Sequence, residues 1–222
     1  MTAIARWLVA ISLFAGFFYP ALWFLPLPPA AILGLKGAGV GLLALAAIVF
    51  GREPDDWLLA ALLAFGASGD VLLEIEVRAG VAAFAAGHVV AIALYWRNRR
   101  SGLRPWDWSK AALLPILAAT IPALLLRGRP EAAPFAAYGL LLGAMAASAS
   151  LSRFLRTVVI GALLFLASDM LIALRMASGE TWLGLPIWLL YYIGQLMIFL
   201  GVRASLPTAD RSHGGPALGV QA

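Results

Sequence analysis

The chain contains no cysteine, and charged residues make up only 12% of its 222 positions. The absence of cysteine excludes disulfide bonds, thiolate metal sites and a cysteine nucleophile. A soluble domain carries charge on about a quarter of its residues, so the low charge content excludes an ordinary soluble fold. Apolar residues are abundant instead, since 63% of the residues are hydrophobic. The composition therefore indicates an integral, multi-pass membrane protein.

Long apolar runs fill almost the whole chain. Each has about 17 to 21 residues, which lets a helix cross a hydrocarbon core about 30 Å thick. The runs lack the polar/apolar alternation of barrel strands, and an open sheet would leave backbone groups unsatisfied in lipid. The sequence therefore predicts an all-α membrane protein, a bundle of about eight transmembrane helices. We expect them near residues 7–25, 31–50, 57–75, 80–97, 109–126, 134–152, 156–174 and 185–203.

These helices form one predicted transmembrane domain, residues 1–204. The remaining segment, residues 205–222, is rich in glycine, proline and polar residues. A segment of that composition has too little apolar surface to build a core, so we expect a disordered polar tail.

The basic residues between the spans are unevenly distributed. If the N-terminus is inside, four of them fall outside and eleven inside, and cytoplasmic loops are the ones enriched in Lys and Arg. Both termini are therefore predicted to be cytoplasmic, and topology explains the net charge of +5 without a nucleic-acid partner. The eleven are Arg6, Arg52, Arg97, Arg99, Arg100, Arg104, Lys110, Arg153, Arg156, Arg203 and Arg211; the four are Arg78, Arg127, Arg129 and Arg175.

Two of the apolar runs contain an aspartate in a similar setting. FGASGDVLLE (65–74) contains Asp70, and FLASDMLIAL (165–174) contains Asp169. An aspartate near a bilayer centre costs roughly 2.5 to 3.5 kcal/mol on insertion scales and normally marks a functional interior. The two spans run in the same direction, which places both carboxyls at similar depth in the outer half of the membrane. The spacing of four spans suggests a parallel 4+4 repeat.

Other polar side chains of the spans are expected at the midplane or above it, where they would converge on a cavity open to the non-cytoplasmic side. Helical spacing predicts that the two tyrosines and the glutamine of the last span share a face. Simpler interpretations remain: hydrogen bonds between helices for the aspartates and the histidine, snorkelling for the lysine and aromatic-belt positions for the tyrosines. These residues are Lys36, Glu74, His88, Tyr191, Tyr192 and Gln195.

The paired carboxyls indicate acid/base chemistry. If Asp70 and Asp169 come close, repulsion would hold one protonated and leave the other ionised, which gives an acid and a base from identical residues. Intramembrane Asp, His and Lys are also the parts of proton relays, so a proton-coupled small-molecule or lipid transporter is the main alternative. A third class is a non-catalytic lipid-binding or scaffold protein.

Four motifs, in this order and spacing, resemble the YhhN-like lysoplasmalogenase family of membrane proteins. Lys36, Tyr138 and Met145 also look similar to family positions. The motifs are GDVLL (69–73), AFAAGHVVAIALY (83–95), GALLFLASDMLIAL (161–174) and YYIGQLMI (191–198).

The resemblance implies an eight-helix hydrolase, expected in the bacterial inner (cytoplasmic) membrane, among membrane lipids. It would cleave the vinyl ether of lysoplasmalogens, a class of lysophospholipid, to a fatty aldehyde and glycerophosphoethanolamine or glycerophosphocholine. Asp70 and Asp169 would then share proton donation and water activation, by the logic of paired carboxylates in glycoside hydrolysis. His88 is expected to assist them. The mechanism requires no cofactor and no metal, although Asp70, His88 and Asp169 could bind one.

The predicted substrate-binding residues complete this interpretation. Gln195 would orient the water or the carboxylates, and Tyr191 or Tyr192 would hydrogen-bond the glycerol portion. A headgroup phosphate needs a cation, for which Lys36, Arg78 and Arg175 are the candidates. Glu74, four residues beyond Asp70, is expected on the same wall of the site.

Overall fold

The computed structural model describes residues 3–206, and the predicted tail lies outside the described residues from position 207 onward. The described part is all-α, as the apolar runs predicted, with eight α-helices and two short 3-10 helices. In chain order they are α1 (Ala3–Phe18), η1 (Tyr19–Phe24), α2 (Pro29–Phe50), α3 (Pro54–Ile75), α4 (Val77–Arg97), α5 (Pro105–Leu125), α6 (Ala132–Leu151), α7 (Arg156–Ser178), η2 (Thr181–Leu183) and α8 (Gly184–Ser205).

Proline marks the start of three of these helices. Pro29, Pro54 and Pro105 are the first residues of α2, α3 and α5. Proline suits this position because the first backbone N–H of a helix has no partner within the helix, and the fixed φ angle already matches the helix. The helix starts therefore lie a few residues before the apolar runs that predicted them.

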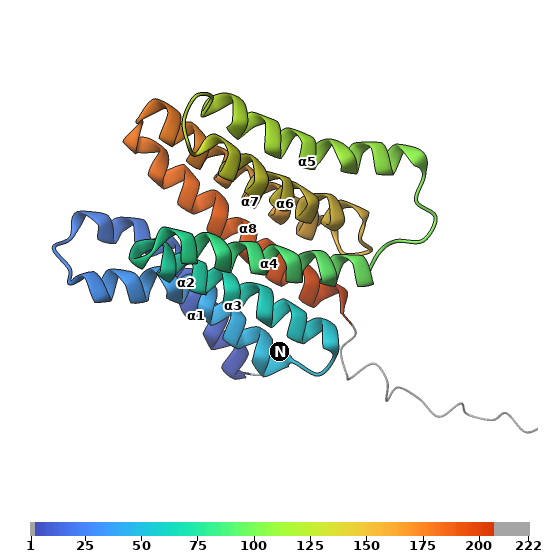
Figure 1. The fold of residues 1–222 in the computed structure, drawn as a ribbon. Coiled ribbons are helices and arrows are strands. Elements are labelled where there is room, and N and C mark those ends of the chain that lie inside the picture. The colour runs from blue at the N-terminus through green and yellow to red at the C-terminus, as the bar shows by residue number, and fades with distance from the viewer. Residues whose placement is uncertain (1–2, 207–222) are drawn as a thin grey trace, which may run out of the picture.

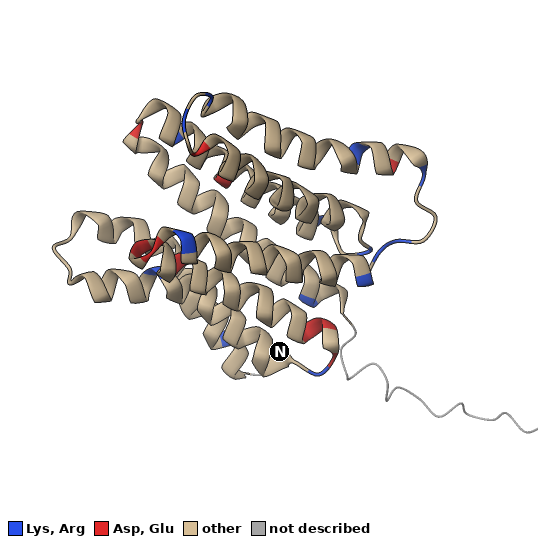
Figure 2. Ribbon diagram, viewed as in Figure 1, with Lys and Arg blue, Asp and Glu red and all other residues tan. Residues whose placement is uncertain are grey.

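Seven helical segments of the described chain are long and apolar enough to cross a membrane. The exception is α3, which has 22 residues, as many as α2, but carries Asp55, Asp56, Asp70 and Glu74. Charged residues gather toward the two ends of the bundle and leave a largely uncharged middle (Figure 2). The fold is that of a multi-pass membrane protein in which α3, the long helix with the most acidic residues, packs between α2 and α4.

The helices form two groups (Figure 1). The first contains α1 to α4, each packed on its neighbour in sequence; the second contains α5, α6 and α7; and α8 runs between them, against α7 on one side and α2 and α3 on the other. We call the end of the bundle that holds residue 3, residue 206 and the α4–α5 link the termini end. The other, with the α3–α4 and α7–α8 links, is the far end. The predicted topology places the termini end in the cytoplasm.

Glycines allow α7 and α8 to touch backbone to backbone. A Cβ atom added at Gly161 would lie 2.6 Å from the Gly194 carbonyl oxygen, and one added at Gly194 would lie 2.7 Å from the Gly161 carbonyl oxygen. Small residues at such crossings allow the close van der Waals packing that replaces the hydrophobic effect in lipid. This crossing fixes α8 against α7, which also fixes the side chains that both helices direct into the interior.

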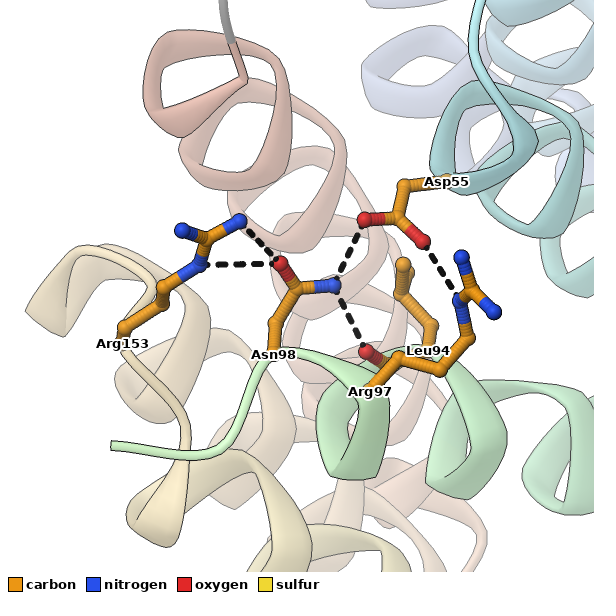
Figure 3. A network of polar contacts seen from close by, with 5 residues as sticks. All are labelled: Asp55, Leu94, Arg97, Asn98 and Arg153. Carbon is orange, nitrogen blue, oxygen red and sulfur yellow. Dashed lines mark hydrogen bonds and ion pairs between the residues drawn. The ribbon is translucent and has the colours of Figure 1, made fainter. Parts of the chain in front are cut away.

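A polar network joins the two groups at the termini end (Figure 3). The Asn98 amide nitrogen donates to Asp55 Oδ2 at 2.8 Å, and Arg97 Nε donates to Asp55 Oδ1 at 2.9 Å. Arg153, in the α6–α7 link, donates to Asn98 Oδ1 at 2.7 and 3.0 Å. Asn98 is only 2% exposed. We call these four residues the termini-end network; an ion pair between Asp56 and Arg203 adds α8 to the same end.

Removing the centre of this network should weaken the whole bundle. Asn98→Ala leaves Arg153 and one Asp55 oxygen without their buried partner, so we expect a loss of about 1–3 kcal/mol in the free energy of unfolding. Denaturant titration of the purified protein measures it. Ser109→Ala is the matched control, because that exposed hydroxyl bonds only to its own helix, and we expect a change within about 0.5 kcal/mol. Equal effects of the two variants would contradict the role assigned to Asn98.

Candidate functional site

A cavity of about 440 Å³ lies in the far half of the bundle, where α2, α3, α4, α6, α7 and α8 meet. Its volume is in the range of small-molecule sites, which are mostly apolar with a few polar groups that fix orientation. The polar residues of the wall are Lys36, Asp70, Glu131, Tyr138, Ser168, Asp169 and Tyr191. The remaining wall is apolar or aromatic. Both intramembrane aspartates therefore face one cavity.

Asp70 lies near the end of α3 and is 3% exposed. The Tyr191 hydroxyl, from α8, donates to its Oδ2 atom at 2.8 Å. The preceding residue must be small, because a Cβ atom at Gly69 would lie 2.6 Å from the Phe84 ring of α4. The Gly-Asp pair thus lets α4 pack closely while the carboxyl turns into the cavity.

Asp169 is held by a longer chain of side chains. The Tyr138 hydroxyl, from α6, donates to Asp169 Oδ2 at 3.0 Å, and the Tyr138 oxygen lies 2.9 Å from His88 Nε2 of α4. A tyrosine hydroxyl has a single proton. Since that proton goes to Asp169, His88 must donate from Nε2 to the Tyr138 oxygen. The result is a directed chain from His88 through Tyr138 to Asp169, which spans three helices.

Aromatic rings separate the two carboxyls from the centre of the bundle. The Phe165 ring centroid lies 5.1 Å from the Tyr191 centroid, 6.1 Å from that of Phe84 and 5.1 Å from that of His88. Phe84 also packs edge-on against Tyr191, at 5.8 Å. Phe84, Phe165 and Tyr191 line the cavity beside both carboxyls with low-dielectric material, in which electrostatic and hydrogen-bonding interactions are stronger than in water.

One ion pair lies beside the cavity. Lys36 Nζ lies 2.6 Å from Glu74 Oε1. The lysine side chain is 14% exposed and reaches the cavity wall, whereas the Glu74 side chain is 55% exposed and lies outside the wall. Lys36 is the single basic residue of the wall among the described residues, and Glu131 adds a carboxylate there. The cavity thus offers an anionic group one cation.

The structure divides the predicted site residues into three groups. Asp70, Asp169, Lys36 and Tyr191 line the cavity, and Glu74 contacts it through Lys36. Two more, His88 and Gln195, lie behind the aromatic rings, in the wall of a second and much smaller cavity.

The remaining two predicted residues lie away from the cavity, which corrects the expectation for them. Tyr192 faces α1, where its hydroxyl lies 2.9 Å from Ser12 Oγ and its ring packs on Gly16. Successive helical residues are about 100° apart, so Tyr191 and Tyr192 diverge, whereas Gln195 remains on the face of Tyr191. Arg175 is exposed in the last turn of α7 and is absent from the wall.

Tyr138 is the residue whose importance the sequence did not reveal. It was similar to a family position, but a lone tyrosine in an apolar run gives no sign that it joins His88 to Asp169. The predicted alternative of a metal held by Asp70, His88 and Asp169 finds no support, since no group of three or more His, Asp or Glu among residues 3–206 is arranged to hold a metal ion.

Comparison with known proteins gives one match. The profile of the YhhN family matches residues 31–202, most of the chain and all the helices that line the cavity. Neither the curated proteins nor the solved structures contain a match.

The chain from His88 to Asp169 should behave as an energetic unit. Tyr138→Phe removes the shared hydroxyl, which leaves His88 and Asp169 each without a hydrogen-bond partner. We expect a double-mutant cycle of Tyr138→Phe with His88→Leu to show a coupling of about 0.5–3 kcal/mol in the free energy of unfolding. The control cycle pairs Tyr138→Phe with Tyr192→Phe, which shares no partner with it and should be additive. Additivity in both cycles would show that the chain is not coupled.

Proposed function

We propose that this chain, which belongs to the YhhN family, is a lysoplasmalogenase-like hydrolase that cleaves the vinyl ether of lysoplasmalogens. The observation that carries the proposal is the pair of carboxyls, the buried Asp70 and the half-buried Asp169, that face one largely apolar cavity. Association of the YhhN family with hydrolase activity supports an enzyme. The substrate class comes from the likeness of the motifs around both aspartates to lysoplasmalogenases.

The shape and polarity of the cavity suit a single-chain lipid. Val77, Val81 and Met176 line it and are themselves exposed on the surface of the bundle. An apolar wall that reaches the outer surface of a membrane bundle gives a hydrocarbon chain a lateral route from the bilayer. Lys36 would bind the headgroup phosphate in exchange for its contact with Glu74, and Glu131 would lie near a headgroup ammonium.

The reaction begins with proton transfer. The protonated aspartate gives its proton to the alkene carbon distal to the ether oxygen, the C=C π bond breaks, and an oxocarbenium ion forms at the carbon attached to oxygen. The ionised aspartate stabilises this cation and then takes a proton from the water that attacks the same carbon. The hemiacetal collapses to an aldehyde and an alcohol as its hydroxyl proton moves to the leaving glycerol oxygen. One water is consumed for each ether cleaved.

The hydrogen bonds to the two carboxyls leave one oxygen of each available for proton transfer to and from the substrate. Tyr191 and Tyr138 each occupy an Oδ2 atom, and within the described chain neither Oδ1 atom has a hydrogen-bond partner. Each tyrosine thus orients a carboxyl and stabilises negative charge on it, while Oδ1 carries or accepts the proton exchanged with the substrate. Pre-oriented groups of this kind lower a barrier without reorganisation during the reaction.

The first test is the release of aldehyde from a lysoplasmalogen by the purified, detergent-solubilised protein. We expect Asp70→Asn and Asp169→Asn each to lower kcat by about 10²- to 10⁴-fold, the usual contribution of a general acid or base. Glu180→Gln is the matched control, an exposed carboxylate in the α7–α8 link that should leave the rate unchanged. Wild-type protein that releases no aldehyde across several headgroups would refute the assignment, and proton-driven flux in proteoliposomes would then favour the transporter.

Lys36 should act on binding. Lys36→Gln removes the single cation of the described wall, so we expect KM to rise about 10- to 100-fold, as for the loss of one charge-assisted hydrogen bond, with little change in kcat. Steady-state kinetics with varied lysoplasmalogen measure both values. Lys110→Gln, at the termini end, should change neither. A fall in kcat at constant KM would place Lys36 in the chemical step instead.

A further inference from the structure

A second cavity lies at the centre of the bundle, behind the aromatic rings. Its volume is about 10 Å³, which is enough for one water molecule. It lies where α3, α4, α6, α7 and α8 meet, near the middle of α4 and α8, and every residue of its wall is buried. The wall is apolar except at three side chains, which are those of His88, Tyr95 and Gln195.

Two of those three side chains have a polar atom without a partner. Tyr95 is 0% exposed and Gln195 is 2% exposed. Neither the Tyr95 hydroxyl nor Gln195 Oε1 makes a hydrogen bond with any described residue. Buried polar atoms of native proteins are almost always paired, with protein or with ordered water. Two unpaired atoms in the wall of one water-sized cavity point to a ligand that both can share.

The third side chain needs a donor. His88 donates from Nε2 to Tyr138, so the neutral ring keeps an unprotonated Nδ1 that can only accept. The bond to Tyr138 is the hydrogen bond recorded for the His88 side chain among residues 3–206, and the ring forms part of the cavity wall. We propose that this cavity binds one structural water molecule, held by His88 Nδ1, Gln195 Oε1 and the Tyr95 hydroxyl.

The donors and acceptors match a water molecule. The water donates one proton to His88 Nδ1 and the other to Gln195 Oε1, and it accepts the Tyr95 proton, which makes the three bonds typical of a buried water. A metal ion does not fit, because the wall contains no carboxylate and too few side chains that could act as metal ligands. Apolar ligands do not fit either, since they would leave three polar groups unpaired.

The water would set the direction of both hydrogen-bond chains. With Oε1 facing the water, the Gln195 amide nitrogen is left on the side of the Tyr191 hydroxyl, since a Cβ atom added at Gly66 would lie 2.9 Å from the nitrogen and 3.5 Å from the hydroxyl oxygen. The amide would donate to that oxygen. Tyr191 must then donate to Asp70. On the other side, the water keeps His88 as the Nε2-protonated tautomer, and Tyr138 must donate to Asp169. One water thus holds both tyrosines as donors to the two carboxyls; this consequence for catalysis rests on the proposed function, whereas the water site does not.

The stability of Tyr95→Phe distinguishes a wet cavity from a dry one. In a dry cavity the hydroxyl is an unpaired buried group, so its removal raises the denaturation midpoint. In a cavity with bound water the substitution removes one of three bonds, so the midpoint falls. Tyr192→Phe is the calibration, because its hydroxyl has a protein partner in Ser12 and its loss lowers the midpoint in either case. A midpoint for Tyr95→Phe above that of the wild type overturns the proposal.

Infrared difference spectroscopy of the wild type and of the same two variants gives an independent test. Exchange into heavy-oxygen water shifts the O–H stretching band of a bound water but not that of a side chain. We expect a shifted band from an isolated, protected water that persists in Tyr192→Phe and is lost or displaced in Tyr95→Phe. The absence of any such difference between the two variants overturns the site.

The lipid assay then tests the coupling to catalysis. If the wild type releases aldehyde, Tyr95→Phe should lower kcat about five-fold, as for one lost hydrogen bond, with KM unchanged. An unchanged kcat overturns the link to the carboxyls. If the wild type releases no aldehyde, the proposed function fails, while the denaturation and infrared results still decide whether the water is bound.

Discussion

Hydrocarbon offers a buried carboxyl no hydrogen-bond partner, so every partner of an intramembrane aspartate must come from the protein itself. In this chain Asp70 and Asp169 obtain theirs from tyrosines on other helices. Each of those bonds requires two helices to meet at a fixed height and rotation. The close glycine crossing of α7 and α8, and the small Gly69 beside Asp70, are what allow that approach.

The two ends of the bundle meet this requirement differently. At the termini end, charged groups bind one another in ion pairs and hydrogen-bond networks, such as the bonds of Asn98 to Asp55 and Arg153. At the far end, Lys36 has a mostly exposed partner, and both carboxyls keep an oxygen without a described partner. Polar groups at the first end therefore serve cohesion, while those at the second remain available to a ligand. A bundle closed at one end and hollow at the other follows.

The sequence was sufficient for much of this. Long apolar runs predicted the helices, because a helix needs about 20 apolar residues to cross the bilayer. The two aspartates within them predicted a shared cavity, because a carboxyl that faces lipid has a high free energy. Helical spacing placed Gln195 on the face of Tyr191 correctly, but it was wrong to place Tyr192 there as well, because Tyr192 faces α1 and not the cavity. The face that each tyrosine takes depends on the rotation of α8, which the close crossing with α7 fixes and the bonds of Tyr192 and Trp188 to α1 support. The bridging role of Tyr138 was likewise hidden, since it arises only when α4, α6 and α7 come together.

The distance along the chain between bonded partners has a consequence for biosynthesis. Tyr191 follows Asp70 by 121 positions, and Tyr192 follows Ser12 by 180. A chain inserted from its N-terminus must therefore hold Asp70 in the membrane through the synthesis of four further helices before its tyrosine arrives. Until α8 docks, that carboxyl depends on water or on neighbouring lipid headgroups. Of the described helices, α8 is the last to be synthesised, and a chain truncated before it would leave Asp70 without the Tyr191 hydroxyl.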